Sequence, residues 1–288
     1  MKSAWTRIMS TLLTLLAGVL GAPGKPPTDE QMQKIRAAIP ERPQVTPRTP
    51  RRLLVFSLTK GFRHSAVECG AFTLIEMGKK TGAYTAEEST DPAVFAADSL
   101  ARYHAIAFNN TTGELFDDPT LKEGFLKWVR AGGGVIGIHA ATDCFYKWPE
   151  FGELMGGYFD GHPWHEKVVL RIEEPDHPLL RAFGGQTRFE VTDEIYQFRA
   201  PYSRDRLRVL ISLDPQKVDM TKPKIKRTDG DFAVSWIRRF GEGRVFYCSL
   251  GHREEIFWNP VVLRHYLDGI QFALGDLDAD ATPRPAPK

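Results

Sequence analysis

Three histidines occupy similar places in this sequence, each directly after a predicted strand or in the loop at its carboxyl end. They are His64, His139 and His252. The carboxyl ends of parallel strands meet at one edge of an α/β sheet, where such proteins bind ligands. We therefore expect the three imidazoles to converge in one crevice. Imidazole transfers protons near neutral pH and also binds metals, so the pattern indicates acid–base chemistry, a metal site or both.

His139 lies at the centre of this pattern. It follows Gly132-Gly-Gly-Val-Ile-Gly-Ile and precedes Ala140-Ala-Thr-Asp143. A buried strand that runs into small residues predicts a strand-to-helix elbow, which presents one side chain at the sheet edge. His139 stands where a GxSxG protein has its nucleophilic serine. Cys144 comes five residues later, which is poorly placed for attack on a substrate. We therefore do not expect covalent acyl chemistry. The glycine run precedes its strand, which is a poor match to a Rossmann phosphate loop, and we expect no nucleotide cofactor.

One carboxylate is expected to join the histidines. Asp193 and Glu194 are adjacent on a predicted strand, so their side chains point to opposite faces and only one can enter a given site. We favour Glu194 as an acid or a further ligand. Three imidazoles and a carboxylate would be an acceptable set for a divalent metal such as zinc, with His64, His139 and His252 as its ligands. Metal-assisted and purely acid–base chemistry both remain open.

Candidate substrate contacts lie in the polar and aromatic segments near these positions. Exposed rings offer flat apolar faces to the C–H side of sugars, and we expect one or two rings of this group to touch a ligand. The group comprises Trp148, Tyr158, Phe159, Trp164, Tyr196 and Trp258. The substrate contacts that we select are His162, Trp164, Tyr158, Tyr196 and Asn109.

The elements that must position these residues alternate between strand and helix. Strands are predicted at 52–58, 84–88, 103–109 and 135–138, with helices at 66–80 and 121–131 and a helix or turn at 92–101 between them. This order is typical of a doubly wound, mostly parallel sheet with helices on both faces. Residues 156–198 instead predict an inserted β-rich segment that leans over the sheet edge. Phe240-Gly-Glu-Gly243 predicts the turn of an antiparallel hairpin, and 261–274 a closing helix.

Composition excludes several functional classes. The chain has 288 residues, a formal charge of +2 and 42% hydrophobic residues, which is typical of a globular protein. This charge balance does not indicate nucleic-acid binding. The cations between Lys217 and Arg227 are interpreted as a solvated loop. Three cysteines without CxxC spacing predict no disulfide.

The two ends of the chain are expected to lie outside the domain. Residues 1–22 have a basic start, an apolar run at 8–20 and small residues before Pro23, which predicts a signal peptide and a secreted or periplasmic protein. An uncleaved membrane anchor is the alternative. Residues 23–51 predict a short helix and a proline-rich arm, 52–275 the domain, and 276–288 a disordered tail.

Five ordered motifs together resemble the ThuA-like (trehalose utilisation) family over about residues 52–275. They are the segment around His139, Gly156-Gly-Tyr-Phe-Asp-Gly-His162-Pro, Asp176-His-Pro, Asp193-Glu-Ile-Tyr196, and Gly243-Arg-Val-Phe-Tyr with Leu250-Gly-His252. The resemblance implies a flavodoxin-like fold similar to that of class I glutamine amidotransferases. On that pattern His139 replaces the nucleophilic cysteine, while His252 and Glu254 or Glu255 fall near the other two triad members. The change at His139 argues against glutamine hydrolysis.

The resemblance also implies an activity. ThuA-like proteins are associated with trehalose and related disaccharides, beside oxidoreductases that make 3-keto-glycosides. We therefore expect an exported enzyme with lyase, isomerase or hydrolase chemistry on a disaccharide or 3-keto-glycoside, with His139, His252, Glu194 and Glu254 as catalytic candidates. Its expected partners are a small sugar and a sugar oxidoreductase of the same pathway. The alternatives are a non-catalytic sugar-binding domain and a structural partner of an oxidoreductase.

Overall fold

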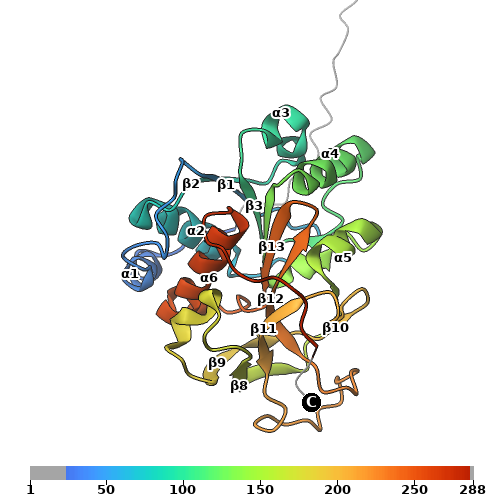
Figure 1. Ribbon diagram of the computed structural model, residues 1–288. Coiled ribbons are helices and arrows are strands. Elements are labelled where there is room, and N and C mark those ends of the chain that lie inside the picture. Colours follow the sequence, from blue (N-terminus) through green and yellow to red (C-terminus); the bar gives the residue numbers. More distant parts are fainter. Residues whose placement is uncertain (1–23, 286–288) are drawn as a thin grey trace, which may run out of the picture.

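The computed structural model describes residues 24–285 and is built on a nine-stranded sheet (Figure 1). Five neighbouring strands pair in parallel, in the order β2-β1-β3-β5-β13. They are β1 (Arg52–Phe56), β2 (Thr85–Ser89), β3 (Ala105–Asn109), β5 (Gly134–Ile138) and β13 (Gly243–Cys248). From β1 the chain crosses over to β2, which pairs on one side of β1. It then crosses back to β3, which pairs on the other side of β1. The loops after β1, β5 and β13 therefore share one edge, as the sequence predicts.

The other half of the sheet is antiparallel and continues from β13 in the order β12-β11-β8-β9. These strands are β8 (Trp164–Ile172), β9 (Arg188–Ile195), β11 (Arg208–Leu213) and β12 (Ala233–Phe240). The predicted hairpin of β12 and β13 is confirmed. The expected position of the β-rich insertion is wrong, because β8 and β9 extend the sheet in its own plane. Pairing with β11 satisfies backbone groups that a segment leaning over the edge would leave open.

Four two-residue strands tie loops together at the ends of the larger elements. They are β4 (Thr112–Gly113), paired with β6 (Asp143–Cys144), and β7 (Tyr158–Phe159), paired with β10 (Phe198–Arg199). The first pair fixes the segment after β3 to the segment after His139, and the second fixes the loop before His162 to the segment after β9. Both pairs lie in segments that lead to predicted site residues.

Helices cover both faces of the sheet, which confirms the doubly wound α/β class and a flavodoxin-like arrangement (Figure 1). The helices are α1 (Asp29–Ala38), α2 (Val67–Thr81), α3 (Ala97–Leu100), α4 (Pro119–Arg130), α5 (Pro149–Met155) and α6 (Pro260–Ala273). Strand β1 shows the two faces directly. Leu53 and Val55 pack in the core under α1, α2 and α6, while Leu54 and Phe56 pack under α3, α4 and α5. A strand buried on both faces reads as a continuous apolar run.

The terminal segments pack more closely on the domain than the sequence indicates. The predicted helix before the domain is α1, which begins with a capping box between Thr28 and Gln31. The prediction of a disordered tail is wrong for residues 276–285. Arg51 pairs with Asp276 at 2.6 Å, and Leu277 is buried, so salt bridges and apolar burial hold this segment in place. The predicted signal peptide and residues 286–288 lie outside the described residues. Within 24–285 no helix has the length and apolar character needed to cross a bilayer.

Candidate functional site

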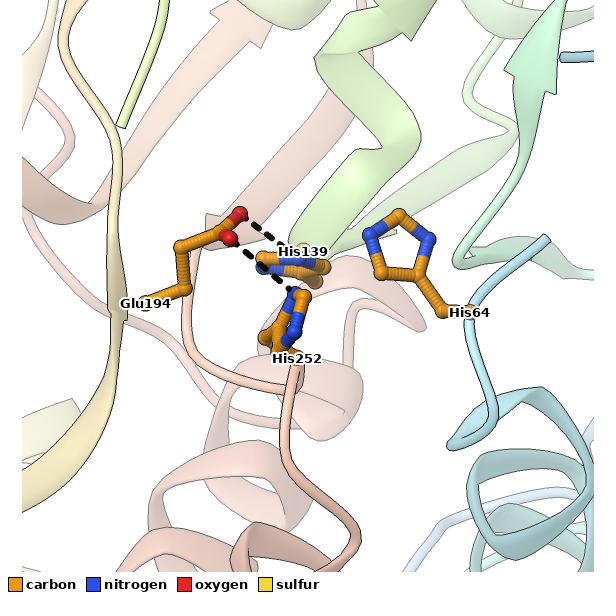
Figure 2. Close-up of side chains that lie close together, drawn as sticks. All are labelled: His64, His139, Glu194 and His252. Atoms are coloured by element: carbon orange, nitrogen blue, oxygen red, sulfur yellow. Dashed lines mark ion pairs between the residues drawn. The ribbon is translucent and has the colours of Figure 1, made fainter. Parts of the chain in front are cut away.

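His64, His139, Glu194 and His252 meet at the carboxyl edge of the parallel strands (Figure 2). Each offers one nitrogen or carboxylate oxygen, and these four atoms all lie within 4.8 Å of one another. His64 comes from the loop after β1, His139 directly follows β5, and Glu194 lies near the end of β9. His252 lies in the loop after β13. The predicted convergence of three imidazoles and one carboxylate is thus confirmed, while the roles of these residues remain predictions.

His139 is held in one orientation by three hydrogen bonds. Its Nδ1 lies 2.6 Å from the carbonyl oxygen of Ser249, and its own carbonyl accepts from the Tyr247 hydroxyl at 2.6 Å. A carbonyl oxygen only accepts, so Nδ1 carries the hydrogen and Nε2 carries the lone pair that faces the cluster. The Tyr196 hydroxyl lies 2.9 Å from Nε2 and donates to it. This is the tautomer needed for a metal ligand or a general base.

The backbone at His139 has the strained geometry expected of an elbow. Its φ is +48°, a left-handed value that is unusual for a residue other than glycine. Gly251, from the loop that carries His252, passes close beside it. A Cβ added to Gly251 would lie 3.3 Å from the His139 Cβ, and Gly251 itself has φ +126°. The backbone angle favours glycine there, and an added side chain would also press against His139.

The carboxylate of Glu194 lies among the histidines. Its Oε2 is 3.4 Å from Nδ1 of His252 and 3.3 Å from Nδ1 of His162, and its Oε1 is 3.8 Å from Nε2 of His139. The side chain of Glu194 is only 6% exposed, whereas those of His162 and His252 are 39% and 22% exposed. The cluster is therefore open to solvent on the side of these two histidines, which gives a ligand an approach.

The four side chains differ in their charge state. Burial, reinforced by neighbouring histidines, lowers the pKa of His64 to about 4 and that of His139 well below its usual value. Burial also works against charge on His252, but Glu194 outweighs it and raises the pKa of His252. In Glu194 the opposing effect of burial is overcome by His252, so its pKa is lowered. His64 and His139 thus present neutral lone pairs beside a His252–Glu194 ion pair.

Asp193, the neighbour of Glu194, does not enter the cluster and instead fixes the loop that carries His252. Its Oδ2 accepts from the backbone N–H of Gly251 at 2.7 Å, and its Oδ1 from that of Arg253 at 2.9 Å. The expectation that only one acidic side chain of the pair enters the site is therefore confirmed. The other one bonds the two residues that flank His252.

Glu254 does not reach the cluster, so its predicted place in the site is wrong. A 3-10 turn, η4 (Glu254–Trp258), begins directly after Arg253 and carries Glu254 toward α1, where its Oε2 accepts from Gln31 at 2.5 Å. The other candidate, Glu255, is exposed and pairs with Arg253. The carboxylate beside His252 is that of Glu194, which comes from the edge strand β9, four places from β13 in the sheet order.

Three of the five selected substrate contacts are structural residues. Trp164 is fully buried against Phe232, and its indole N–H donates to the Asp219 carbonyl at 2.8 Å. Tyr158 is 8% exposed, and its hydroxyl donates to the Trp148 carbonyl at 2.7 Å. Asn109 is fully buried, and its amide nitrogen donates to Ser57 and to the Val67 carbonyl. These three side chains are buried, so the structure does not present them to a substrate at the cluster, although Oδ1 of Asn109 has no hydrogen-bond partner.

The two other selected residues lie beside the cluster. Tyr196 is buried, so it reaches the site through its hydroxyl on His139 and not through an exposed ring face. His162 is at the solvent-exposed rim, in ion-pair distance of Glu194. Its neighbour His165 is also exposed and packs edge-on to His252 with ring centroids 4.6 Å apart. Sequence reasoning missed Phe62, which lies two residues before His64 and is 66% exposed.

The cysteines provide no nucleophile. Cys69, Cys144 and Cys248 are buried free thiols. The thiol of Cys144, the one closest to the elbow in sequence, donates to the Ala141 carbonyl, and burial raises its pKa. A thiol held protonated in this way does not attack substrate at neutral pH.

The donor set fits a divalent cation. Two or three imidazoles with a carboxylate are the ligands that zinc commonly has in catalytic sites. Ligand atoms on one tetrahedral zinc ion lie about 3.4 Å apart, given bonds of about 2.1 Å, so the four atoms, within 4.8 Å, need only a small inward shift. Nδ1 of His252, which faces Glu194 Oε2 at 3.4 Å, is buried without a hydrogen-bond partner, as expected of a side chain still short of one contact (Figure 2).

A mixed α/β sheet that gathers three histidines and a glutamate at the carboxyl edge of its parallel strands defines the class of this protein. Residues 52–273 match the ThuA family, described as trehalose utilisation, and the chain belongs to this family. The resemblance noted in the sequence is thereby confirmed, and carbohydrate use is the broad setting of the chain. No protein of curated function is similar enough in sequence to count as a match.

Solved structures of ThuA-like proteins have the same fold. A ThuA-like protein of Bacteroides uniformis is 22% identical, with a TM-score of 0.64 over 79% of this chain and 93% of that one. A ThuA-like protein of Parabacteroides merdae is 20% identical, with a TM-score of 0.58 over 78% of this chain and 90% of that one. A cytoplasmic protein of Salmonella typhimurium LT2 is 12% identical, with a TM-score of 0.52, and covers 77% of this chain and 99% of that one. At these identities the likeness concerns the fold alone.

Proposed function

We propose that this protein is an enzyme of carbohydrate breakdown that acts on a 3-keto-glycoside through proton transfer at the carbon beside the ketone. The convergence of His64, His139, Glu194 and His252 within 4.8 Å supports this proposal most directly. A pure binding surface has no need for several titratable groups around one point, whereas carbon acid chemistry needs a base and an acid together.

The reaction that suits these groups is elimination. The ketone at C3 acidifies the hydrogen on C2, and Nε2 of His139 takes that proton after the Tyr196 hydroxyl has turned away from its lone pair. The C–H electrons form the C1–C2 double bond as the bond from C1 to the glycosidic oxygen breaks. The leaving oxygen receives a proton from His252, whose charged form Glu194 stabilises. Return of the proton to the other face of C2 would instead give an isomer by the same first step.

A divalent cation fits this scheme. His64, His139, Glu194 and His252 would hold it, and it would polarise the ketone and the enolate that forms. In that case His139 would be a ligand, and the Tyr196 hydroxyl, which lies 2.9 Å from its Nε2, would be the candidate for proton transfer. The two versions differ in which residue holds the proton, and a chelator separates them.

The test is proton NMR of 3-keto-trehalose incubated with the protein, with His139→Ala and a chelator-treated sample beside it. His104→Ala is the matched control, because His104 directly precedes β3, at the amino ends of the parallel strands, and its ring accepts a hydrogen bond from the Arg52 N–H. We expect turnover in wild type and in the control, and none with His139→Ala. Signal broadening of the sugar without turnover would instead identify a sugar-binding domain.

We further propose that the protein is exported and acts with a sugar oxidoreductase that supplies its ketone. The basic start and the apolar run at 8–20 support export. Expression of the whole chain in a bacterium, followed by fractionation and N-terminal sequencing, tests this: cleavage near Ala22 and recovery outside the cytoplasm are expected. An intact N-terminus in the cytoplasmic fraction would contradict it.

A further inference from the structure

Phe62 is the exposed large hydrophobic side chain of residues 24–285, with 66% of its surface accessible. Its ring lies edge-on to that of His64, with centroids 4.8 Å apart. His64 in turn packs on His139 at 4.7 Å and on His252 at 5.1 Å. The one large apolar ring that this part of the chain leaves in water is therefore next to the candidate site.

The backbone that carries Phe62 is fixed, so the exposure of the ring does not arise from a loose loop. The N–H groups of Lys60 and Gly61 donate to the Thr112 carbonyl at 2.8 and 3.2 Å. The Thr112 hydroxyl donates to the Phe62 carbonyl at 2.8 Å. A rigid loop that presents an apolar ring has already lost the conformational entropy that a ligand would otherwise have to remove.

A second aromatic group lies on the other side of the cluster. Phe159 packs on Tyr196 with centroids 4.4 Å apart, and Tyr196 packs on His139 at the same distance. Phe159 also stacks nearly parallel to His162, at 6.0 Å and 15°. Tyr196 is buried and Phe159 and His162 are half-buried, whereas Phe62 is 66% exposed. Because Phe62 packs on His64, a ligand that fills the cluster and extends past His64 comes within reach of the Phe62 ring.

We propose that Phe62 is a sugar-binding platform: it stacks on the apolar C–H face of the sugar unit that adjoins the one held at the histidine cluster. This inference rests on the proposed function and deepens it, because it assigns the site a substrate of at least two sugar units. Phenylalanine has no polar group, so it recognises the flat C–H face of a ring and not a particular hydroxyl. The residue is therefore a determinant of substrate size and not of sugar identity.

The experiment compares Phe62→Ala, Phe62→Trp and wild type in binding trehalose and in binding and turnover of 3-keto-trehalose. The control is Phe240→Ala, a half-buried phenylalanine at the hairpin between β12 and β13, at the opposite edge of the sheet. Phe62→Ala should weaken binding and raise KM about tenfold, the size of one stacking contact. Phe62→Trp should restore both, and the control should match wild type. Thermal unfolding and mass by light scattering are measured on every variant.

The failure of this inference and that of the proposed function give different results. Sugar binding that depends on Phe62 without any turnover would uphold the platform and overturn the enzyme. Turnover with the same KM in wild type and Phe62→Ala would uphold the enzyme and overturn the platform. A change of oligomeric mass in Phe62→Ala with unchanged sugar affinity would show that the ring contacts a second copy of the chain, and would also overturn the inference.

Discussion

The Tyr196 hydroxyl lies 2.9 Å from Nε2 of His139, and the two rings pack with centroids 4.4 Å apart. Both side chains are fully or almost fully buried. Since Nδ1 of His139 donates to the Ser249 carbonyl, Nε2 must accept, and the phenol is its partner. Tyr196 therefore controls the lone pair on which either version of the proposed chemistry depends.

If a cation occupies the cluster and the Tyr196 hydroxyl transfers the proton, Tyr196→Phe should lower turnover of a 3-keto-glycoside by about 10²-fold or more, the usual contribution of one positioned acid–base group. The ring remains, so packing on His139 is kept and the thermal unfolding temperature should change little. Steady-state rates and a thermal melt check this. A variant that turns over as fast as wild type would exclude the hydroxyl from proton transfer.

Removal of a ligand should abolish metal binding. His252→Ala and Glu194→Gln each delete one of the four converging donors, so both should lose most of the zinc that wild type retains after dialysis. His104→Ala, remote from the cluster, should retain it. Elemental analysis of the dialysed proteins gives the stoichiometry. Equal metal content in wild type and in both variants, zero included, would contradict a metal centre built from these side chains.

Asp193→Ala should damage the site indirectly. The two backbone N–H groups of Gly251 and Arg253 lose their buried acceptor, which costs about 1–3 kcal/mol for each group left unpaired. The His252 loop is then less well fixed, and we expect metal affinity to fall about 10–100-fold, as for other residues that orient a ligand. Urea unfolding and a zinc titration measure the two effects. Unchanged affinity in a destabilised variant would show that the loop holds its position without Asp193.

The acid stability of the fold should depend on His265. This histidine in α6 is buried between the Leu179 carbonyl and the Ser235 hydroxyl, and burial lowers its pKa to about 4. An unfolded histidine titrates near 6.5, so between these values the unfolded chain binds more protons than the native one. Native stability is therefore complete above about pH 6.5 and falls by up to about 3 kcal/mol as the pH drops to about 4.

His265→Gln should remove that part of the pH dependence. Asp268, one turn away, has a pKa raised to about 7 by burial and gives the opposite slope, but it is present in both proteins. The measurement is the free energy of unfolding in urea at about pH 7.5 and about pH 4.5 for each protein. Wild type should lose more stability on acidification than the variant does. Parallel losses would show that His265 is not the group responsible.

The parallel half of the fold and the three histidines were predictable because both follow from local pattern. Buried parallel strands read as apolar runs, and residues directly after such strands share a sheet edge whatever their separation in sequence. His64, His139 and His252 could be placed together on this basis alone. The alternation of side chains on a strand predicted that only one of Asp193 and Glu194 enters the site. It does not say which of the two faces the site.

The rest depends on tertiary contacts that one sequence does not encode locally. Trp164 and Tyr158 lie in an aromatic segment that the sequence predicts as a loop. In the structure both side chains are buried, and each donates a hydrogen bond to a backbone carbonyl. Glu254 lies two residues after His252, yet the turn at η4 directs it to α1. Phe62 had one available signal, its position in the same short loop as His64, but exposure of a large apolar ring is visible only in the folded chain.

Exchange of the C2 hydrogen of 3-keto-trehalose in D₂O, followed by proton NMR, tests the central claim most directly, because it reports proton abstraction whether or not a bond then breaks. Wild type and His104→Ala should exchange or consume that hydrogen far faster than buffer does, and His139→Ala should match buffer. Exchange by His139→Ala at the wild-type rate, or none by wild type above buffer in a sample that binds the sugar, would contradict the claim that this cluster is a catalytic centre.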